Sequence, residues 1–145
     1  MKNRIIILVL LSLIIITGCV KNQSIKYKKG KNNIVENMKL LIDEKEYILE
    51  LESNTTVSEF IKSIPFETTM EELNGNEKYV YLDKTLPTNS YNPRKIEAGD
   101  VMLFGNNCLV IFYKSFNTSY SYTKIGHINN LPDLGSNDIA IKFYK

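Results

Sequence analysis

From residue 39 to the end of the chain, apolar and polar positions alternate in short runs that predict β-strands with one buried face. Asn-Gly-Asn at 74–76 separates two of these runs, because hairpin turns favour residues that tolerate positive φ. Two runs in the middle of the segment are almost continuously apolar and predict central strands. The expected strands lie at 40–42, 47–51, 66–70, 78–82, 101–105, 108–113, 120–128 and 138–144.

One segment has the period of a helix instead. Its apolar residues follow one another at i, i+3, i+4 and i+7, which predicts a short helix near 56–64 with one buried stripe. Thr56 and Glu59 fit a capping box at its start, and Pro65 ends it. Residues 131–134 fit a further short turn of helix. The apolar stripe consists of Val57, Phe60, Ile61 and Ile64.

These elements predict a mainly β fold in a single domain of residues 39–145. Seven or eight short strands joined by turns fit either a sandwich or a barrel. A small closed antiparallel barrel removes the exposed strand edges, so it is the expected architecture. The segment 85–100 is expected to be a long loop, because Pro87 and Pro93 cannot donate ladder hydrogen bonds.

The first residues have a different pattern. An apolar run from Ile5 to Ile16 follows a basic start, and at about a dozen residues it is too short for the roughly 20 that span a membrane. Ile16-Thr17-Gly18-Cys19 resembles a bacterial lipobox, which implies cleavage after residue 18 and a lipid on Cys19. We therefore expect a signal peptide at 1–18, a tether at 19–38 and a lipid-anchored protein on the extracytoplasmic face of the cell membrane. The alternatives are a signal peptide with an incidental cysteine and a short uncleaved anchor.

Charge and cysteine content follow from this division. Loss of residues 1–18, which carry Lys2 and Arg4 but no acid, takes the formal net charge from +2 to zero. The tether is rich in Lys and Asn and has no apolar period, so it is expected to be a flexible linker. Nothing in the charge pattern supports nucleic-acid binding. With Cys19 lipidated, Cys108 has no disulfide partner.

Much of the segment resembles a known family. "LNGNEKYVYLDKTLPTN" and "AGDVMLFGNNCLVIFYKSFNTSYSYTKIGHI", with the opening hairpin and helix, are similar to the bacterial cyclophilin-like fold proteins. The resemblance covers 38–143 and implies a small antiparallel barrel related in shape to the peptidyl-prolyl isomerases. Cyclophilins carry a catalytic arginine in a Phe-His-Arg strand motif, whereas this chain has "KYVYLDK" there and no Trp. Its one domain arginine, Arg94, lies in the expected loop.

Few residues carry recognisable chemistry. The apolar neighbours of Cys108 favour a buried hydrophobe over a reactive thiol. His127 lacks the Cys, Asp or Glu spacing of a metal site, so no metal or cofactor is expected. A Cys108–His127 dyad is conceivable, since spatial proximity is not readable from sequence. The pairs Glu71-Glu72 and Asp43-Glu44 fit solvated turns.

The segment 113–124 interleaves aromatic residues with Ser and Thr, a mixture of apolar ring and polar group that binding pockets favour. The alternative is that its rings fill the barrel wall. With Tyr81 from the strand at 78–82, the candidate ligand-binding residues are Tyr81, Tyr113, Thr118, Ser119, Tyr120 and Tyr122.

Together these patterns predict a monomeric, membrane-tethered module that binds a small ligand, a peptide or an envelope protein without prolyl isomerase activity. Two alternatives stay open. One is a divergent peptidyl-prolyl isomerase, and the other is an envelope scaffold that uses its outer surface.

Overall fold

The computed structural model describes residues 36–145. The predictions for the signal peptide, for Cys19 and for most of the tether lie outside these residues. Its strands are β1 (Asn37–Ile42), β2 (Lys45–Leu51), β3 (Phe66–Leu73), β4 (Glu77–Tyr81), β5 (Lys95–Ile96), β6 (Asp100–Phe104), β7 (Cys108–Phe112), β8 (Phe116–Asn117), β9 (Tyr122–Ile128) and β10 (Ile139–Tyr144), and α1 spans Thr55–Ile61.

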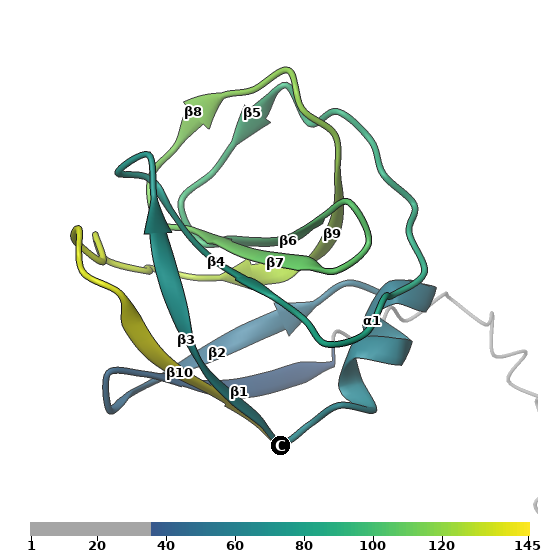
Figure 1. Cartoon of the computed structure of the whole chain (residues 1–145), viewed down its shortest axis with the longest axis horizontal. Coiled ribbons are helices and arrows are strands. Elements are labelled where there is room, and N and C mark those ends of the chain that lie inside the picture. Colours follow the sequence, from purple (N-terminus) through teal and green to yellow (C-terminus); the bar gives the residue numbers. More distant parts are fainter. Residues whose placement is uncertain (1–35) are drawn as a thin grey trace, which may run out of the picture. The chain divides into compact units, whose positions relative to one another are not determined.

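Eight of the strands close into one antiparallel barrel in the order β1-β10-β3-β4-β7-β6-β9-β2, and β2 pairs back onto β1 (Figure 1). The predicted fold class is confirmed. Closure leaves no free edge in the barrel, which is the physical reason that short alternating strands adopt it.

The interior of the barrel is mainly apolar, with Lys78 as its one fully buried charged residue among those that the structure describes. On β1, Met38, Leu40 and Ile42 are buried and alternate with more exposed residues, as one-sided strands require. From α1, Phe60 adds its ring to this core and meets Phe143 of β10 edge to face, with 5.4 Å between ring centroids. Burial of each such side chain contributes on the order of 2 kcal/mol to folding.

The start of α1 differs from the prediction. Asn54, and not Thr56, is the N-cap, and its side-chain oxygen accepts the Val57 N–H at 2.9 Å. The Thr56 hydroxyl instead donates to the carbonyl of Pro87 at 2.6 Å and ties the helix to the long loop. The helix ends at Ile61 and not at Ile64, so the predicted end before Pro65 is wrong. Val57 and Phe60 of the expected stripe are buried in the core, which confirms that part of the prediction.

Two other features differ from the sequence pattern. Strand β1 begins at Asn37, so Asn37 and Met38 belong to the barrel and not to the tether predicted for 19–38. Within residues 36–145, α1 is the only helix, and 131–134 has no helical turn. No helix of this part of the chain is long and apolar enough to cross a membrane.

The predicted loop 85–100 also contains a strand. Its end forms β5, which pairs with β8 as a separate two-stranded sheet on the far side of β6 and β7 from β1 and β2 (Figure 1). Ile96 of β5 and Phe116 of β8 pack with residues on the outer face of β6 and β7. A second apolar cluster therefore lies outside the barrel wall, and it includes Ile96, Met102, Cys108, Val110, Phe112 and Tyr122.

Candidate functional site

The outer face of four neighbouring strands presents a row of side chains, three of which are aromatic. In the antiparallel register, Tyr81 of β4 lies opposite Cys108 of β7, which in turn lies opposite Phe104 of β6. Phe104 lies opposite Tyr122 of β9. Because side chains opposite one another share a face of the sheet, this row is continuous across the wall.

Strand β4 has two chemically different faces. Glu77, Tyr79 and Tyr81 point outward, since side chains alternate along a strand. Lys78 is fully buried on the inner face, and Val80 packs against the barrel core.

The outward residues of β4 and the aromatic row line an open hollow of about 320 Å³. We call it the outer-wall hollow. Its most exposed rings are Tyr81 (64% exposed), Tyr120 (63%) and Phe104 (43%). Its lining consists of Leu73, Asn74, Glu77, Tyr79, Tyr81, Phe104, Cys108, Val110, Tyr120 and Tyr122.

The rings of the hollow support one another. Tyr79 and Tyr81 meet edge to face with 5.9 Å between centroids, and Phe104 lies 5.9 Å from Tyr120 and 5.6 Å from Tyr122. The Tyr79 hydroxyl also donates to Glu71 at 2.7 Å. Ring pairs at these separations are each worth about 0.5–1.5 kcal/mol, so the walls of the hollow are largely preformed.

Glu77 is the one charged residue of the lining. Its side chain is half-buried, and no described residue donates a hydrogen bond to it or forms an ion pair with it. Burial, and then the negative charge of Glu72, raise the pKa of this carboxyl. The hollow therefore contains an uncompensated carboxylate.

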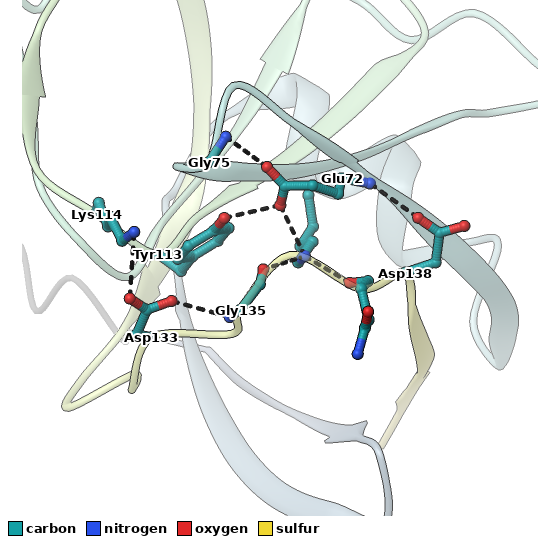
Figure 2. A network of polar contacts seen from close by, with 9 residues as sticks. Glu72, Gly75, Tyr113, Lys114, Asp133, Gly135 and Asp138 are labelled. Carbon is teal, nitrogen blue, oxygen red and sulfur yellow. Dashed lines mark hydrogen bonds and ion pairs between the residues drawn. The ribbon is translucent and has the colours of Figure 1, made fainter.

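Glu72 has the opposite environment, and it corrects the prediction that Glu71-Glu72 is a solvated turn. Both residues lie in β3, and Glu72 accepts hydrogen bonds from Lys78 at 2.8 Å and Tyr113 at 2.7 Å (Figure 2). The turn prediction failed because the sequence does not reveal that a buried lysine needs this carboxylate as its partner.

The same network fixes the connection between β9 and β10. Lys78 Nζ donates to the carbonyls of Gly135 and Asn137 at 2.7 and 2.6 Å, so its three N–H groups meet three acceptors. Gly75 also donates its N–H to Glu72, and Asp133 pairs with Lys114 at 3.2 Å (Figure 2). A network satisfied in this way stabilises the fold and offers no free group to a ligand.

The structure brings three of the candidate residues together. Tyr81, Tyr120 and Tyr122 line the hollow. Tyr113 does not line the hollow, because it is buried on the inner face of the wall, where its hydroxyl donates a hydrogen bond to Glu72. Thr118 and Ser119 precede Tyr120 without lining the hollow. The Thr118 hydroxyl accepts the Tyr120 N–H at 3.1 Å, and the Ser119 carbonyl accepts from Asn92 at 2.9 Å.

Sequence reasoning missed other members of the lining, above all Glu77 and Phe104. Glu77, Tyr79 and Tyr81 occupy alternate positions of the sequence, which was a usable signal. Because side chains alternate along a strand, this spacing places all three on one face. Phe104 carried no such signal, because its position beside Tyr122 depends on the pairing of β6 with β9.

Cys108 and His127 do not form a dyad. Cys108 lies in register with Phe104, which lies opposite Tyr122 of β9. Tyr122 precedes His127 by five residues, which corresponds to roughly 17 Å along the strand. Burial, and then the charge of Glu77, raise the pKa of the Cys108 thiol to about 11, so it has little thiolate character. His127 Nδ1 lies instead 3.0 Å from Asp100 Oδ1. Within residues 36–145, no group of three or more His, Cys, Asp or Glu side chains is placed to hold a metal ion.

A smaller polar hollow of about 180 Å³ lies near the start of α1, beside Asn54, Tyr91 and Thr123. Two of its polar side chains already have hydrogen-bond partners in the protein. Asn54 Nδ2 donates to the Lys124 carbonyl at 2.8 Å, and Thr123 Oγ1 accepts the Asn89 N–H at 3.0 Å. The outer-wall hollow is therefore the stronger candidate for a binding site.

The position of Arg94 bears on isomerase chemistry. This exposed residue precedes β5 with φ of 64°, and it does not line the outer-wall hollow. None of the residues that line the hollow is an arginine, so the lining supplies no guanidinium to a bound peptide.

Comparison with known proteins identifies a matching family and a similar solved structure. The family model described as the cyclophilin-like family matches residues 40–143. Among solved structures, the chain is similar to the solution structure of the hypothetical protein AF2241 from Archaeoglobus fulgidus. The TM-score is 0.53 at 17% identity, over 79% of this chain and 98% of that one. At this identity the likeness shows the fold alone. No curated protein matches the sequence.

Proposed function

The chain belongs to the cyclophilin-like family, and from that premise we propose that it is a membrane-tethered extracytoplasmic lipoprotein whose barrel binds a ligand in the outer-wall hollow. The lipobox-like Ile16-Thr17-Gly18-Cys19 supports the tether. The hollow supports binding, and its lining argues against prolyl isomerisation. Function belongs to a site and not to a fold, so the family alone does not supply this activity.

The exposure of Tyr81, Phe104 and Tyr120 around one concavity is the observation that carries the proposal. Large rings that face water together are a signature of a binding surface, because burying them against a partner is favourable. Ligand sites are concave, mostly apolar and aromatic, with a few polar groups, and begin at about 300 Å³. The outer-wall hollow has each of these properties.

The shape of the hollow limits the size of its ligand. It follows β4 from Glu77 to Tyr81, and a strand of five residues is roughly 14 Å long. That length suits a small organic molecule or about four residues of extended peptide.

Substitution of Tyr81 and Tyr120 by alanine together tests the proposal. The probe is 2-phenylethanol, a neutral aromatic alcohol, titrated into the methyl-labelled full chain in dodecyl maltoside micelles. The Val110 methyl resonance reports from the floor of the hollow, and that of the inward-facing Val80 serves as an internal reference. We expect a saturable shift at Val110 in the parent chain, and at least tenfold weaker binding in the double variant.

Ile48→Ala is the matched control, because Ile48 is an exposed apolar residue of β2 away from the hollow. Its affinity for the probe should equal that of the parent. The double tyrosine variant should lose about 1–3 kcal/mol of unfolding free energy, since both rings are exposed and one ring pair is lost with each. If its binding is unchanged, the outer-wall hollow is not the ligand site, and an envelope scaffold that uses the rest of the outer surface becomes the better description.

The isomerase alternative leads to a separate prediction. Without a guanidinium at the hollow, nothing favours the twisted amide, and loss of one such electrostatic contact costs about a hundredfold or more in rate. We expect no measurable acceleration of Xaa-Pro isomerisation in a tetrapeptide assay with the full chain. Turnover that disappears with Arg94→Ala would contradict this expectation, because the loop arginine would then act in catalysis.

A further inference from the structure

The charge balance of the outer-wall hollow is one-sided. Glu77 is its one charged residue, and none of the residues that line it is basic. The nearest lysine in sequence, Lys78, points to the opposite face of β4 and uses its N–H groups on Glu72, Gly135 and Asn137. No cation from the described residues therefore neutralises Glu77.

The rings around Glu77 strengthen this bias. The faces of aromatic rings carry partial negative charge and attract cations placed within about 6 Å of the ring centre. Tyr79, Tyr81, Phe104, Tyr120 and Tyr122 all border the same space. A half-buried carboxylate beside several aromatic rings suits an organic ammonium ion, which combines a positive nitrogen with an apolar body.

Other ligand classes fit less well. A carboxylate or phosphate ligand would be repelled by Glu77 and would find no basic partner in the lining. A neutral apolar ligand would fill the aromatic part but would leave Glu77 buried further without a partner, which is costly.

We propose that the natural ligand of the outer-wall hollow is a small organic amine, bound as an ammonium ion with its charge against Glu77 and its apolar body among the tyrosine rings. This inference rests on the proposed function and specifies the chemical class of its ligand.

A matched pair of probes tests it. Phenethylammonium, the form of 2-phenylethylamine at pH 7, has almost the size and shape of 2-phenylethanol but carries a positive charge. Both are titrated into the methyl-labelled full chain in uncharged maltoside micelles, with Val110 as the reporter. We expect the ammonium ion to bind at least tenfold more tightly than the alcohol.

Glu77→Gln removes the charge while it keeps the shape of the side chain. We expect this variant to bind both probes with similar affinity, with the alcohol bound at least as well as by the parent. Glu67→Gln is the control, because Glu67 is an exposed carboxylate of β3 that pairs with Lys142 outside the hollow. That variant should keep the full preference for the ammonium ion. A retained Val110 resonance position in the unliganded Glu77→Gln chain shows that it is folded.

The outcomes separate the two proposals. Equal affinity of the parent for both probes, or a preference that survives Glu77→Gln, overturns the amine inference and leaves the binding function intact. If neither probe shifts Val110, the binding function itself fails, and the amine inference fails with it.

Discussion

Glu72 and Glu77 are the same residue type five positions apart, and their surroundings shift their pKa values in opposite directions. Burial raises the pKa of Glu72, but hydrogen bonds from Lys78 and Tyr113 lower it more, so the net shift is downward. Burial and the charge of Glu72 raise the pKa of Glu77, which has no compensating donor among residues 36–145. A carboxylate kept at a cost to stability is typical of functional positions.

Glu77→Gln should therefore make the protein more stable at pH 7. A raised pKa in the folded state means that the folded chain binds more protons than the unfolded chain as pH rises through 4.5. Stability is lost over that range, and the charged form remains unfavourable at higher pH. The glutamine variant should gain in urea midpoint at pH 7, and the gain should disappear below pH 4.5, where both states are protonated.

The reverse result would assign Glu77 a structural role. If Glu77→Gln lowers the midpoint at pH 7, the carboxylate has a stabilising partner, and the hollow is not short of positive charge. Glu67→Gln again serves as the comparison, since it removes an exposed ion pair.

The two faces of strand β4 have different roles, one in folding and the other in the candidate binding site. Its inner face contributes Lys78 to the network that fixes the connection between β9 and β10, and its outer face lines the hollow. Burial of a lysine charge is tolerated only while its hydrogen-bond acceptors stay in place, because an unpaired buried charge strongly destabilises the fold.

Lys78→Met tests the importance of this network. Methionine retains most of the volume but leaves Glu72 and two carbonyls without their donor, so we expect a loss of about 3–5 kcal/mol in unfolding free energy by urea titration. Lys142→Met removes an exposed pair with Glu67 and should cost less than about 1 kcal/mol. Adding Glu72→Gln to Lys78→Met should recover part of the loss, because no buried charge is then left unpaired. Equal effects of the two lysine variants would show that the network contributes little.

The elements of the barrel could be predicted from the sequence because alternation is a local property. Each main strand has its own apolar face, and the stripe on α1 is visible within eight residues. The identity of the N-cap residue, in contrast, depends on a contact with a distant part of the sequence. Asn54 and Thr56 are both good caps, and the hydrogen bond from Thr56 to Pro87, 31 residues away, decides between them. Strands β5 and β8 have two residues each, too few for any period to show.

The candidate site was predictable only in part for a related reason. Tyr120 and Tyr122 are predicted as ligand-binding residues from the aromatic cluster in the sequence, and both line the hollow. Tyr113 belongs to the same cluster but faces the interior of the barrel, because it continues the inward phase of Leu109 and Ile111 in β7. The partners of these residues depend on strand register, which a single sequence does not specify.

The whole protein is predicted to be held at the membrane by lipid on Cys19, a residue outside the described part of the chain. Acyl chains contribute about 0.8 kcal/mol per buried CH₂, so two or more make release negligible. Cys19→Ala should abolish incorporation of labelled palmitate and shift the protein out of the membrane fraction. Ser12→Ala, within the apolar run, is a control that should leave both unchanged. Retention of the Cys19→Ala protein in the membrane would identify the segment as a simple anchor.

The placement of the hollow outside the barrel wall has a consequence for how such a protein changes over generations. Replacing a residue of the apolar interior by alanine typically costs 2–5 kcal/mol, a large part of the stability of a domain this size. Exchange of an exposed residue such as Tyr81 or Tyr120 costs less, about 0.5–1.5 kcal/mol for the ring pair that is lost. Selection, or a designer, can therefore alter most of the rim of the hollow while the barrel that carries it stays intact, so new specificities are accessible from this chain by few substitutions.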